Sequence, residues 1–400
     1  MSVSSDFPEP EKEFMSLWDW FRSPSKSIRK VLLIDGGVST HLESIISPKK
    51  FSHRELWSSS LLLTKDGKDR IFEGHRDWLE SGADILTTVT YQCHYGLFRE
   101  STSTEPKSSV ETNNSVLEIL PEDKIKDMMV DGVKLAKMAI DGTANRLILS
   151  TSSAPSRTVG PFVVASTGPY GAAMADGSEY TGIYPAHVTR QALVNFHTRK
   201  ARTLLMEGEP DGLAIETIPN IEEVGVVCEV LRDLQQHREM IEPESSPIAC
   251  WISLACRNGR EMNDGNSLEE ALQIVQSYDP TGRWIAGVGI NCFDSVHLLS
   301  LVKIIAKASL MQDCSRRGII LYPNSGEGWD AVHEKWREGS GASDDKFADR
   351  LMEAMQLIQD VFETGEAYVP KIIIGGCCRT SPATIAMLRK RVDEGSIMND

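Results

Sequence analysis

The chain has 400 residues, 41% of them hydrophobic and 25% charged, which is typical of a globular protein with a large core. Its formal net charge of -15 argues against a nucleic acid or an anionic membrane as partner. No apolar run approaches the roughly 20 residues of a membrane helix, and early acids such as Asp6 and Glu9 do not fit a targeting segment. We therefore expect a cytoplasmic protein that acts on small molecules and keeps its cysteines reduced.

Eight short apolar runs alternate with longer amphipathic stretches. The runs comprise residues 31–34, 83–88, 147–150 (extended or doubled by 162–165), 212–215, 248–254, 285–290, 318–321 and 371–374. Residues 123–140 have apolar positions at helical spacing and are predicted to form a helix. Strands separated by helices pair in parallel, so eight such units predict an α/β fold, a closed (β/α)8 TIM barrel. A doubly wound sheet with an inserted domain is the alternative.

The domain organisation follows from the same pattern. We expect one barrel domain over residues 28–395, preceded by an N-terminal extension of residues 1–27. Residues 101–115 are rich in Ser, Thr, Asn and Glu and are predicted to form a polar insertion. The oligomeric state stays open at this point.

Three cysteines follow two of the predicted strands. Cys377 and Cys378 come after two glycines at the end of the last run, and Cys292 ends the sixth. Neighbouring residues in a continuing strand face opposite ways, so Gly375 and Gly376 are expected to let the backbone bend. Because barrel chemistry lies at the carboxyl ends of the strands, the three thiols could hold one Zn²⁺ and leave its fourth position open, as in catalytic zinc sites.

The alternative is three ordinary buried thiols, since free cysteine is often buried. We interpret the other five cysteines in this way: Cys93, Cys228, Cys250, Cys256 and Cys314. Three thiolates would leave a zinc site at formal charge -1, which weakens the ion as a Lewis acid. A substrate thiol would still lose its proton there and stay electron-rich. The expected chemistry is transfer of an alkyl group from a soft electrophile, such as a methyl sulfonium, to a thiol.

Motifs along the chain resemble those of the zinc-dependent homocysteine S-methyltransferases, from about Val31 to Val392. The matching segments are, in the family's order, Leu-Ile-Asp-Gly-Gly (33–37), Leu-Trp-Ser (56–58), Ala-Asp-Ile-Leu-Thr-Thr (83–88), Thr-Tyr-Gln (90–92), Gly-Pro-Tyr-Gly-Ala (168–172), Ala-Asp-Gly-Ser-Glu-Tyr (175–180), Glu-Thr-Ile-Pro-Asn (216–220), Gly-Ile-Asn-Cys (289–292), Tyr-Pro-Asn-Ser-Gly-Glu (322–327) and Gly-Gly-Cys-Cys-Arg-Thr (375–380). The resemblance implies a (β/α)8 barrel with Cys292, Cys377 and Cys378 as zinc ligands. Homocysteine thiolate would be the fourth ligand, and methionine the product.

The remaining strand ends suggest contacts to the amino acid part of homocysteine. Asp35 and Glu216 end the first and fourth runs, where two carboxylates could hold an ammonium group, and the resemblance implies carboxylates there for that purpose. The alternative for Asp35 is a turn residue before two glycines. Backbone amides around Gly36, Gly37 and Thr88 are predicted to bind the carboxylate of the substrate.

The methyl donor is expected to be a cation, for which aromatic and acidic groups are natural walls. The candidates are Tyr170, Asp176, Glu179, Tyr180, Trp57 and Tyr91. Segment 175–180 resembles the branch that uses S-methylmethionine or S-adenosylmethionine, although a plain polar loop is the competing interpretation. Asn324 ends the seventh run and is expected to line or shape the pocket.

The alternative function is a non-catalytic zinc- or thiol-binding sensor on the same barrel. It rests on Val89, where many members of the family have Asn, and on the polar insertion at residues 101–115.

Overall fold

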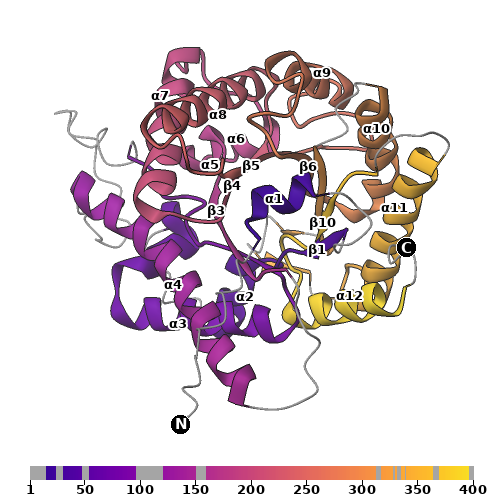
Figure 1. Cartoon of the computed structure of the whole chain (residues 1–400), viewed down its shortest axis with the longest axis horizontal. Helices are drawn as coiled ribbons and strands as arrows, with labels where there is room; N and C mark the ends of the chain where they lie inside the picture. The colour runs from indigo at the N-terminus through magenta and orange to yellow at the C-terminus, as the bar shows by residue number, and fades with distance from the viewer. Residues whose placement is uncertain are drawn as a thin grey trace, which may run out of the picture.

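The computed structural model describes residues 15–23, 30–46, 54–95, 120–149, 159–311, 317–327, 329–330, 335–337, 339–363 and 369–395. Eight strands form a ring that is surrounded by helices (Figure 1). The strands are β1 Val31–Leu33, β2 Ile85–Thr87, β3 Phe162–Thr167, β4 Gly212–Ile218, β5 Ala249–Leu254, β6 Gly287–Asp294, β7 Gly318–Asn324 and β10 Ile372–Ile374.

All pairings in this sheet are parallel, in the order β1-β10-β7-β6-β5-β4-β3-β2. The two ends of the sheet meet at a bridge between Ile34 and Ile85, where the Asp35 amide donates to the Ile85 carbonyl at 3.0 Å. Closure leaves no free sheet edge, and the predicted (β/α)8 TIM barrel is confirmed.

The helices form the outer layer. Their bounds are α2 Val38–Ile45, α3 Lys65–Glu80, α4 Glu122–Leu149, α5 Tyr170–Met174, α6 Ser178–Thr181, α7 Arg190–Thr203, α8 Ile221–Ile241, α9 Leu268–Tyr278, α10 Leu298–Met311, α11 Asp344–Glu363 and α12 Pro382–Glu394. The other elements are η2 Arg54–Leu63, η4 Leu204–Gly208, η5 Ser295–His297 and the hairpin of β8 Trp329–Asp330 and β9 Lys335–Trp336. Side chains that accept from amides of the first turn fix several helix starts, for example Thr64, Asn220 and Ser267.

One predicted strand is wrong. Residues 147–149 are the last turn of α4, and the third strand is Phe162–Thr167 alone. A short apolar run does not distinguish a strand from the end of a helix, and here the run simply continues the predicted helix at 123–140. The insertion at residues 101–115 lies outside the described residues, and the domain boundaries stay predictions.

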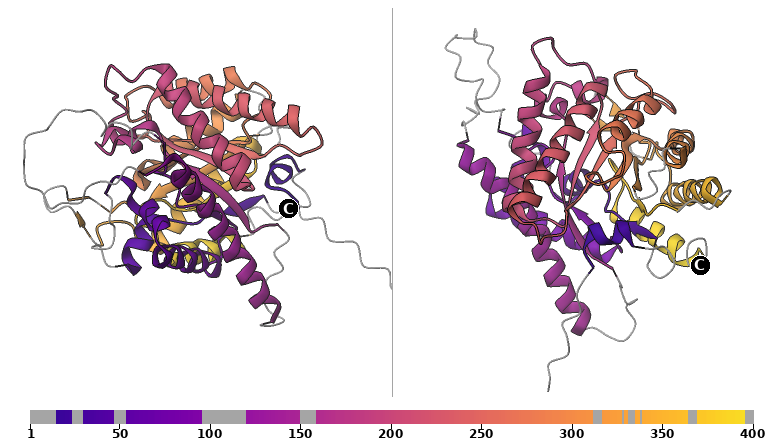
Figure 2. Two further views of the ribbon diagram at one scale, coloured as in Figure 1. Left: turned by 90° about the vertical axis from the view of Figure 1, so that its left-hand side faces the viewer. Right: turned by 45° about the horizontal axis from the view of Figure 1, so that its top comes forward.

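Helix α1, Leu17–Arg22, covers the N-terminal end of the barrel. It lies across the middle of the ring in Figure 1 and at one end of the molecule in the left view of Figure 2. Leu17, Trp20 and Phe21 are buried against barrel residues, and a Cβ on Gly318, at the start of β7, would overlap Phe21. The opposite end of the barrel therefore holds the carboxyl ends of the strands.

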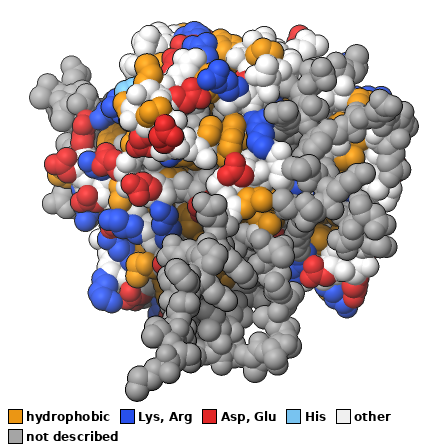
Figure 3. Space-filling view, viewed as in Figure 1, with side chains coloured by type: hydrophobic (Ala, Val, Ile, Leu, Met, Phe, Trp, Pro, Cys, Tyr) orange, Lys and Arg blue, Asp and Glu red, His pale blue; other side chains and the backbone are white. Residues whose placement is uncertain are grey.

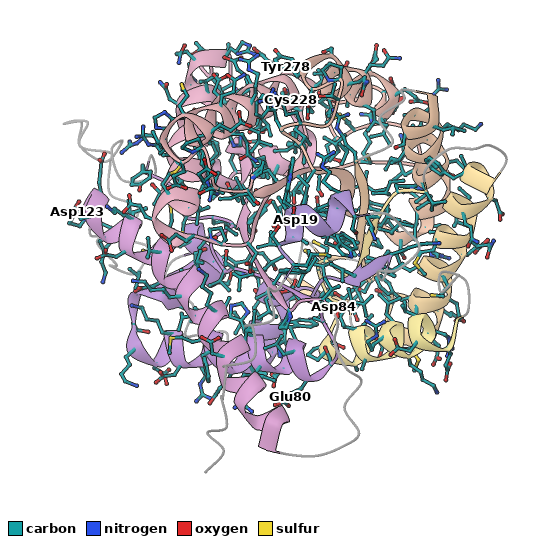
Figure 4. The ribbon with its side chains drawn as sticks, viewed as in Figure 1. Asp19, Glu80, Asp84, Asp123, Cys228 and Tyr278 are labelled. Atoms are coloured by element: carbon teal, nitrogen blue, oxygen red, sulfur yellow. The ribbon has the colours of Figure 1, made fainter. Side chains whose placement is uncertain are left out.

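A buried carboxylate fastens the closing strands to the helical layer. Asp84, labelled in Figure 4, precedes β2, and its Oδ2 accepts from the Leu33 amide at 2.9 Å and from Arg389 Nη1 at 3.2 Å. A buried charge needs such partners, which explains why an acid is tolerated within the apolar run 83–88. Asp84 is therefore a structural residue of the barrel.

The described surface has mixed charge. On the face seen in Figure 3, basic and acidic side chains are interspersed over the described part. Within the described ranges, none of the helices is both long enough and apolar enough to span a bilayer.

Candidate metal centre and substrate pocket

The three predicted zinc ligands converge. The sulfur atoms of Cys292, Cys377 and Cys378 all lie within 4.8 Å of one another. Cys292 Sγ is 2.6 Å from Cys377 Sγ and 3.8 Å from Cys378 Sγ. Hydrogen bonds from the other two thiols hold the pKa of Cys378 well below its ordinary value. The cluster therefore places one readily ionised thiol among three soft donors.

The donor set fits a zinc ion. In a tetrahedral site with Zn–S bonds of about 2.3 Å, two sulfurs lie about 3.8 Å apart. Cys292 and Cys378 have that separation, whereas Cys377 must move away from Cys292 to reach it. Thiolate sulfur is a preferred ligand of Zn²⁺. The residues present therefore match the group that the sequence predicts.

Irregular backbone turns Cys292 towards the other two. The β6–β7 register shifts between Asn291 and Asp294, and Cys292 has a left-handed backbone with a φ of 54°. A bulge at the end of a barrel strand re-aims side chains, and a left-handed non-glycine residue is strained unless its surroundings hold it. The strain is concentrated at a candidate ligand position.

The end of β7 holds the cysteine pair. The Cys377 amide donates to the Pro323 carbonyl at 2.8 Å, and the Cys378 amide donates to Asn324 Oδ1 at 3.1 Å. Asn324 is not among the residues that line the pocket, but it holds the backbone of a candidate ligand, so its predicted role in shaping the pocket is the one that its contacts favour.

The two glycines before the pair act differently from the prediction. Neither Gly375 nor Gly376 adopts a positive φ. Instead, a Cβ on Gly375 would lie 2.4 Å from the Ile34 carbonyl oxygen, and one on Gly376 would lie 2.2 Å from Thr380 Oγ1. Close packing, rather than a free backbone, requires glycine there, and the positive φ belongs to Arg379, after the pair.

The other described cysteines lie away from this cluster. Cys93, Cys228, Cys250 and Cys256 are buried, and burial raises the pKa of each to between about 11 and about 12. Cys228 is on α8 in the helical layer, as labelled in Figure 4. These thiols have the inert setting of structural cysteines. Cys314 lies outside the described residues.

A pocket opens over the cluster at the carboxyl ends of the strands. It contains every predicted acceptor residue and four of the predicted donor residues. Its lining comprises Ile34, Asp35, Gly36, Gly37, Val38, Ser39, Thr40, Trp57, Thr87, Thr88, Val89, Tyr91, Ser166, Glu179, Tyr180, Glu216, Thr217, Asn291, Cys292, Tyr322, Gly376, Cys377 and Cys378.

Two buried carboxylates face this pocket. Asp35 is 1% exposed, and its oxygens accept from the Thr87 amide at 2.7 Å and from the Thr87 hydroxyl at 2.9 Å. Glu216 accepts from the hydroxyl of Ser166 and, at 3.5 Å, from Asn291 Nδ2. Burial raises the pKa of both carboxyl groups, and the charge of Glu216 raises that of Asp35 further. A cation between them would relieve both effects.

Sequence reasoning missed the residues that orient these acids. Thr87 holds Asp35, Ser166 holds Glu216, and Asn291 bonds the Thr217 amide and hydroxyl at 2.8 Å each. A polar residue at the end of an apolar run is the signal that could have found Thr87, Ser166, Thr217 and Asn291. Their sequence does not say which acid each would meet.

The amides predicted to bind the carboxylate of the substrate differ in whether they already have a hydrogen-bond partner. The Thr88 amide donates to the Val164 carbonyl, and its hydroxyl accepts from the Ser166 amide, so both groups join β2 to β3. The Gly36 amide makes no hydrogen bond to another described residue. The Gly37 amide donates to Thr380 Oγ1 at 3.0 Å. Of the three, Gly36 has the amide that a substrate carboxylate could use.

Only some of the residues predicted for the methyl-donor site line the pocket. Trp57, Tyr91, Glu179 and Tyr180 line the pocket, but Tyr170 and Asp176 do not. Tyr170 packs edge-on against Tyr184 and Phe196 in the helical layer. Asp176 is exposed and bonds the amide and hydroxyl of Ser178. Asp176 thus bonds within the short segment that carries Glu179.

Comparison with known proteins agrees with this geometry. A model of the homocysteine S-methyltransferase family matches residues 32–392. The chain belongs to the homocysteine S-methyltransferase family. Members of this family are methyltransferases, and the cysteine cluster of this member is a site that could hold a metal.

Similar proteins come from plants and bacteria. The chain is 32% identical to the selenocysteine Se-methyltransferase of Brassica oleracea var. italica, over 90% of this chain and 88% of that protein. It is 32% identical to homocysteine S-methyltransferase 1 of Arabidopsis thaliana, over 88% and 90%. The metallated form of the homocysteine methyltransferase MmuM from Escherichia coli has a similar structure, with a TM-score of 0.65, 26% identity, and 91% and 96% of the two chains covered.

Proposed function

We propose that this enzyme transfers a methyl group from S-methylmethionine, or from S-adenosylmethionine, to the thiol of homocysteine and so forms methionine. The observation that supports it most directly is the convergence of three cysteine sulfurs beside two buried carboxylates in one pocket. A substrate with a thiol at one end and an ammonium at the other matches both features.

The acceptor would lie along the pocket floor. Asp35 and Glu216 bind its ammonium through charge-assisted hydrogen bonds, which are about twice as strong as neutral ones. The Gly36 amide binds its carboxylate, and the thiol lies against the cysteines. The three contacts together fix the sulfur for attack, and such positioning accounts for much of the rate of a two-substrate reaction.

Cys292, Cys377 and Cys378 would hold a zinc ion, whose chemistry when bound is to stabilise a substrate thiol in its thiolate form. Trp57, Tyr91 and Tyr180 would surround the positively charged sulfonium. In the transfer, a new carbon–sulfur bond forms at homocysteine while the bond from the methyl carbon to the sulfonium breaks. The donor leaves as a neutral thioether.

Replacing Cys378 by Ala tests the metal assignment. Because one of three ligands is lost, we expect bound zinc and methyl transfer to fall together by at least tenfold, while the barrel stays folded. Metal analysis, a labelled-methyl assay and circular dichroism measure the three properties. Cys250→Ala, a change in the barrel wall, is the control that keeps zinc. Full activity of Cys378→Ala without metal would contradict the proposal.

A labelled-methyl assay with homocysteine also separates the enzyme from the sensor. Methionine formation from either sulfonium donor supports the enzyme, whereas tight binding of homocysteine without turnover would favour the sensor.

A further inference from the structure

The pocket contains a third carboxylate that the proposed acceptor site leaves unused. Glu179, on α6, lines the pocket together with Trp57, Tyr91 and Tyr180. Among the described residues, no lysine, arginine or histidine forms an ion pair with it. A half-buried acid without a cationic neighbour is costly unless a ligand supplies the charge.

The segment that carries Glu179 is held in place. The Glu179 carbonyl accepts from Asn263 Nδ2 at 2.9 Å, and the Gly182 carbonyl accepts from Asn220 Nδ2 at 2.8 Å. Gly171 packs directly on the backbone, where a Cβ would lie 2.6 Å from the Glu179 nitrogen. The carboxylate is therefore presented by a fixed backbone, which lowers the entropy lost on binding a ligand.

Glu179 is set apart from the acceptor carboxylates. Asp35 and Glu216 are 1% and 8% exposed and act on one another, whereas the charges that act on Glu179 come from Cys378 and Asp176. Burial raises the pKa of Glu179 to about 7. The three acids thus form two sites, a deep pair and a single group nearer the surface, and both lie close to the cysteine cluster.

Resting on the proposed function, we propose that Glu179 binds the α-ammonium group of the methyl donor and makes the enzyme selective for amino-acid sulfonium donors. In S-methylmethionine, two methylene groups separate the sulfonium from the carbon that carries the ammonium. The aromatic residues around Glu179 then accept the sulfonium, while the carboxylate accepts the ammonium. A sulfonium without an amino group gains only the first contact.

Two donors and two variants test this selectivity. The donors are S-methylmethionine and its deaminated counterpart, 4-(dimethylsulfonio)butanoate, assayed with homocysteine at pH 8, where the carboxylate is ionised. We expect Glu179→Gln to raise the KM for S-methylmethionine by roughly 10- to 100-fold, because a hydrogen bond between charged groups is lost. The KM values for the deaminated donor and for homocysteine should stay within about twofold, and Glu179→Asp should restore part of the loss.

Glu222→Gln is the matched control, because Glu222 is an exposed acid on α8 outside the pocket lining. It should leave the KM for both donors unchanged. An equal rise for both donors in Glu179→Gln would overturn the inference, since Glu179 would then act on the sulfonium. No change for either donor would overturn it as well.

Failure of the proposed function gives a different result. If the unchanged enzyme transfers no methyl group to homocysteine from S-methylmethionine or from S-adenosylmethionine, the proposed reaction is wrong. Calorimetric titration with S-methylmethionine then tests Glu179 separately: the inference requires weaker binding to Glu179→Gln than to Glu222→Gln, and equal binding would refute it.

Discussion

Asp35, Glu216 and Glu179 are acids in positions where an ordinary surface carboxylate would not be found. Each has a pKa raised mainly by burial, so each carries a solvation cost in its charged form. Raised pKa values in a pocket are typical of functional sites. A bound cation can offset the solvation free energy that the charged carboxylate lost on burial. At the scale of single residues, these three acids are therefore the groups whose charged forms the proposed substrates would stabilise most.

His75 shows the same cost without a ligand to offset it. Its ring is fully buried in α3, both nitrogens lack a hydrogen-bond partner among the described residues, and burial lowers its pKa to about 4. In the unfolded chain it protonates near pH 6.5, so unfolding takes up a proton. We expect its contribution to stability, full above pH 6.5, to fall by about 3 kcal/mol as the pH drops to 4.

Urea unfolding of the parent enzyme and of His75→Leu at pH 7.5 and pH 4.5 measures this effect. The parent should lose more stability between the two pH values than the variant does. His237→Leu, a change at a partly exposed position of α8, is the control. Equal losses in the parent enzyme and His75→Leu would show that His75 finds a partner when it is protonated.

At the scale of elements, the ends of β4 and β6 depart from regular strand geometry. Thr217 and Cys292 both have a left-handed backbone, with φ values of 63° and 54°, and both lie at register shifts. Asn291 is fully buried between them and bonds the Thr217 amide and hydroxyl. One side chain thus holds together the strand that carries Glu216 and the strand that carries Cys292, a candidate metal ligand.

Replacing Asn291 by Ala should therefore affect stability and metal together. The Thr217 amide would be left unsatisfied, which costs about 1–3 kcal/mol of unfolding free energy. We expect weaker zinc binding, measured by competition with a chelator, and a higher KM for homocysteine. Asn195→Ala, at an exposed position of α7, should change neither. Loss of stability with unchanged zinc affinity would show that Asn291 supports the fold alone.

At the scale of the whole molecule, the two ends of the barrel have separate tasks. Helix α1 fills the N-terminal end with apolar side chains, whereas the strand ends that hold the cysteines and carboxylates open into the pocket. In TIM barrels the carboxyl end carries the chemistry and the amino end contributes stability. Changes at α1 should consequently alter stability and leave the reaction unaffected.

Phe21→Ala tests this division. Because Phe21 is 1% exposed, the cavity should lower the free energy of unfolding by about 3–5 kcal/mol. Zinc content and the KM for homocysteine should stay unchanged below the unfolding transition. Asp19→Ala, at an exposed position of the same helix, should cost at most about 1 kcal/mol. A raised KM in Phe21→Ala would mean that the two ends are coupled.

The sequence by itself determined the barrel and the three cysteines. Alternation of apolar runs and helices is a local pattern, and a cysteine or an acid at the end of a run is visible without coordinates. Parallel strands bring their carboxyl ends to one face, so residues such as Asp35, Glu216 and Cys292 could be placed together in advance.

Only the tertiary structure decided which side chains meet. Residues 147–149 are helical because they continue α4, a choice that a short apolar run does not reveal. Glu179 lines the pocket whereas Tyr170 and Asp176 do not. The Thr88 amide, predicted to bind the carboxylate of the substrate, donates to the Val164 carbonyl instead. Side-chain direction at a strand end or in a loop depends on bulges and on contacts between distant segments, and these are not written in local spacing.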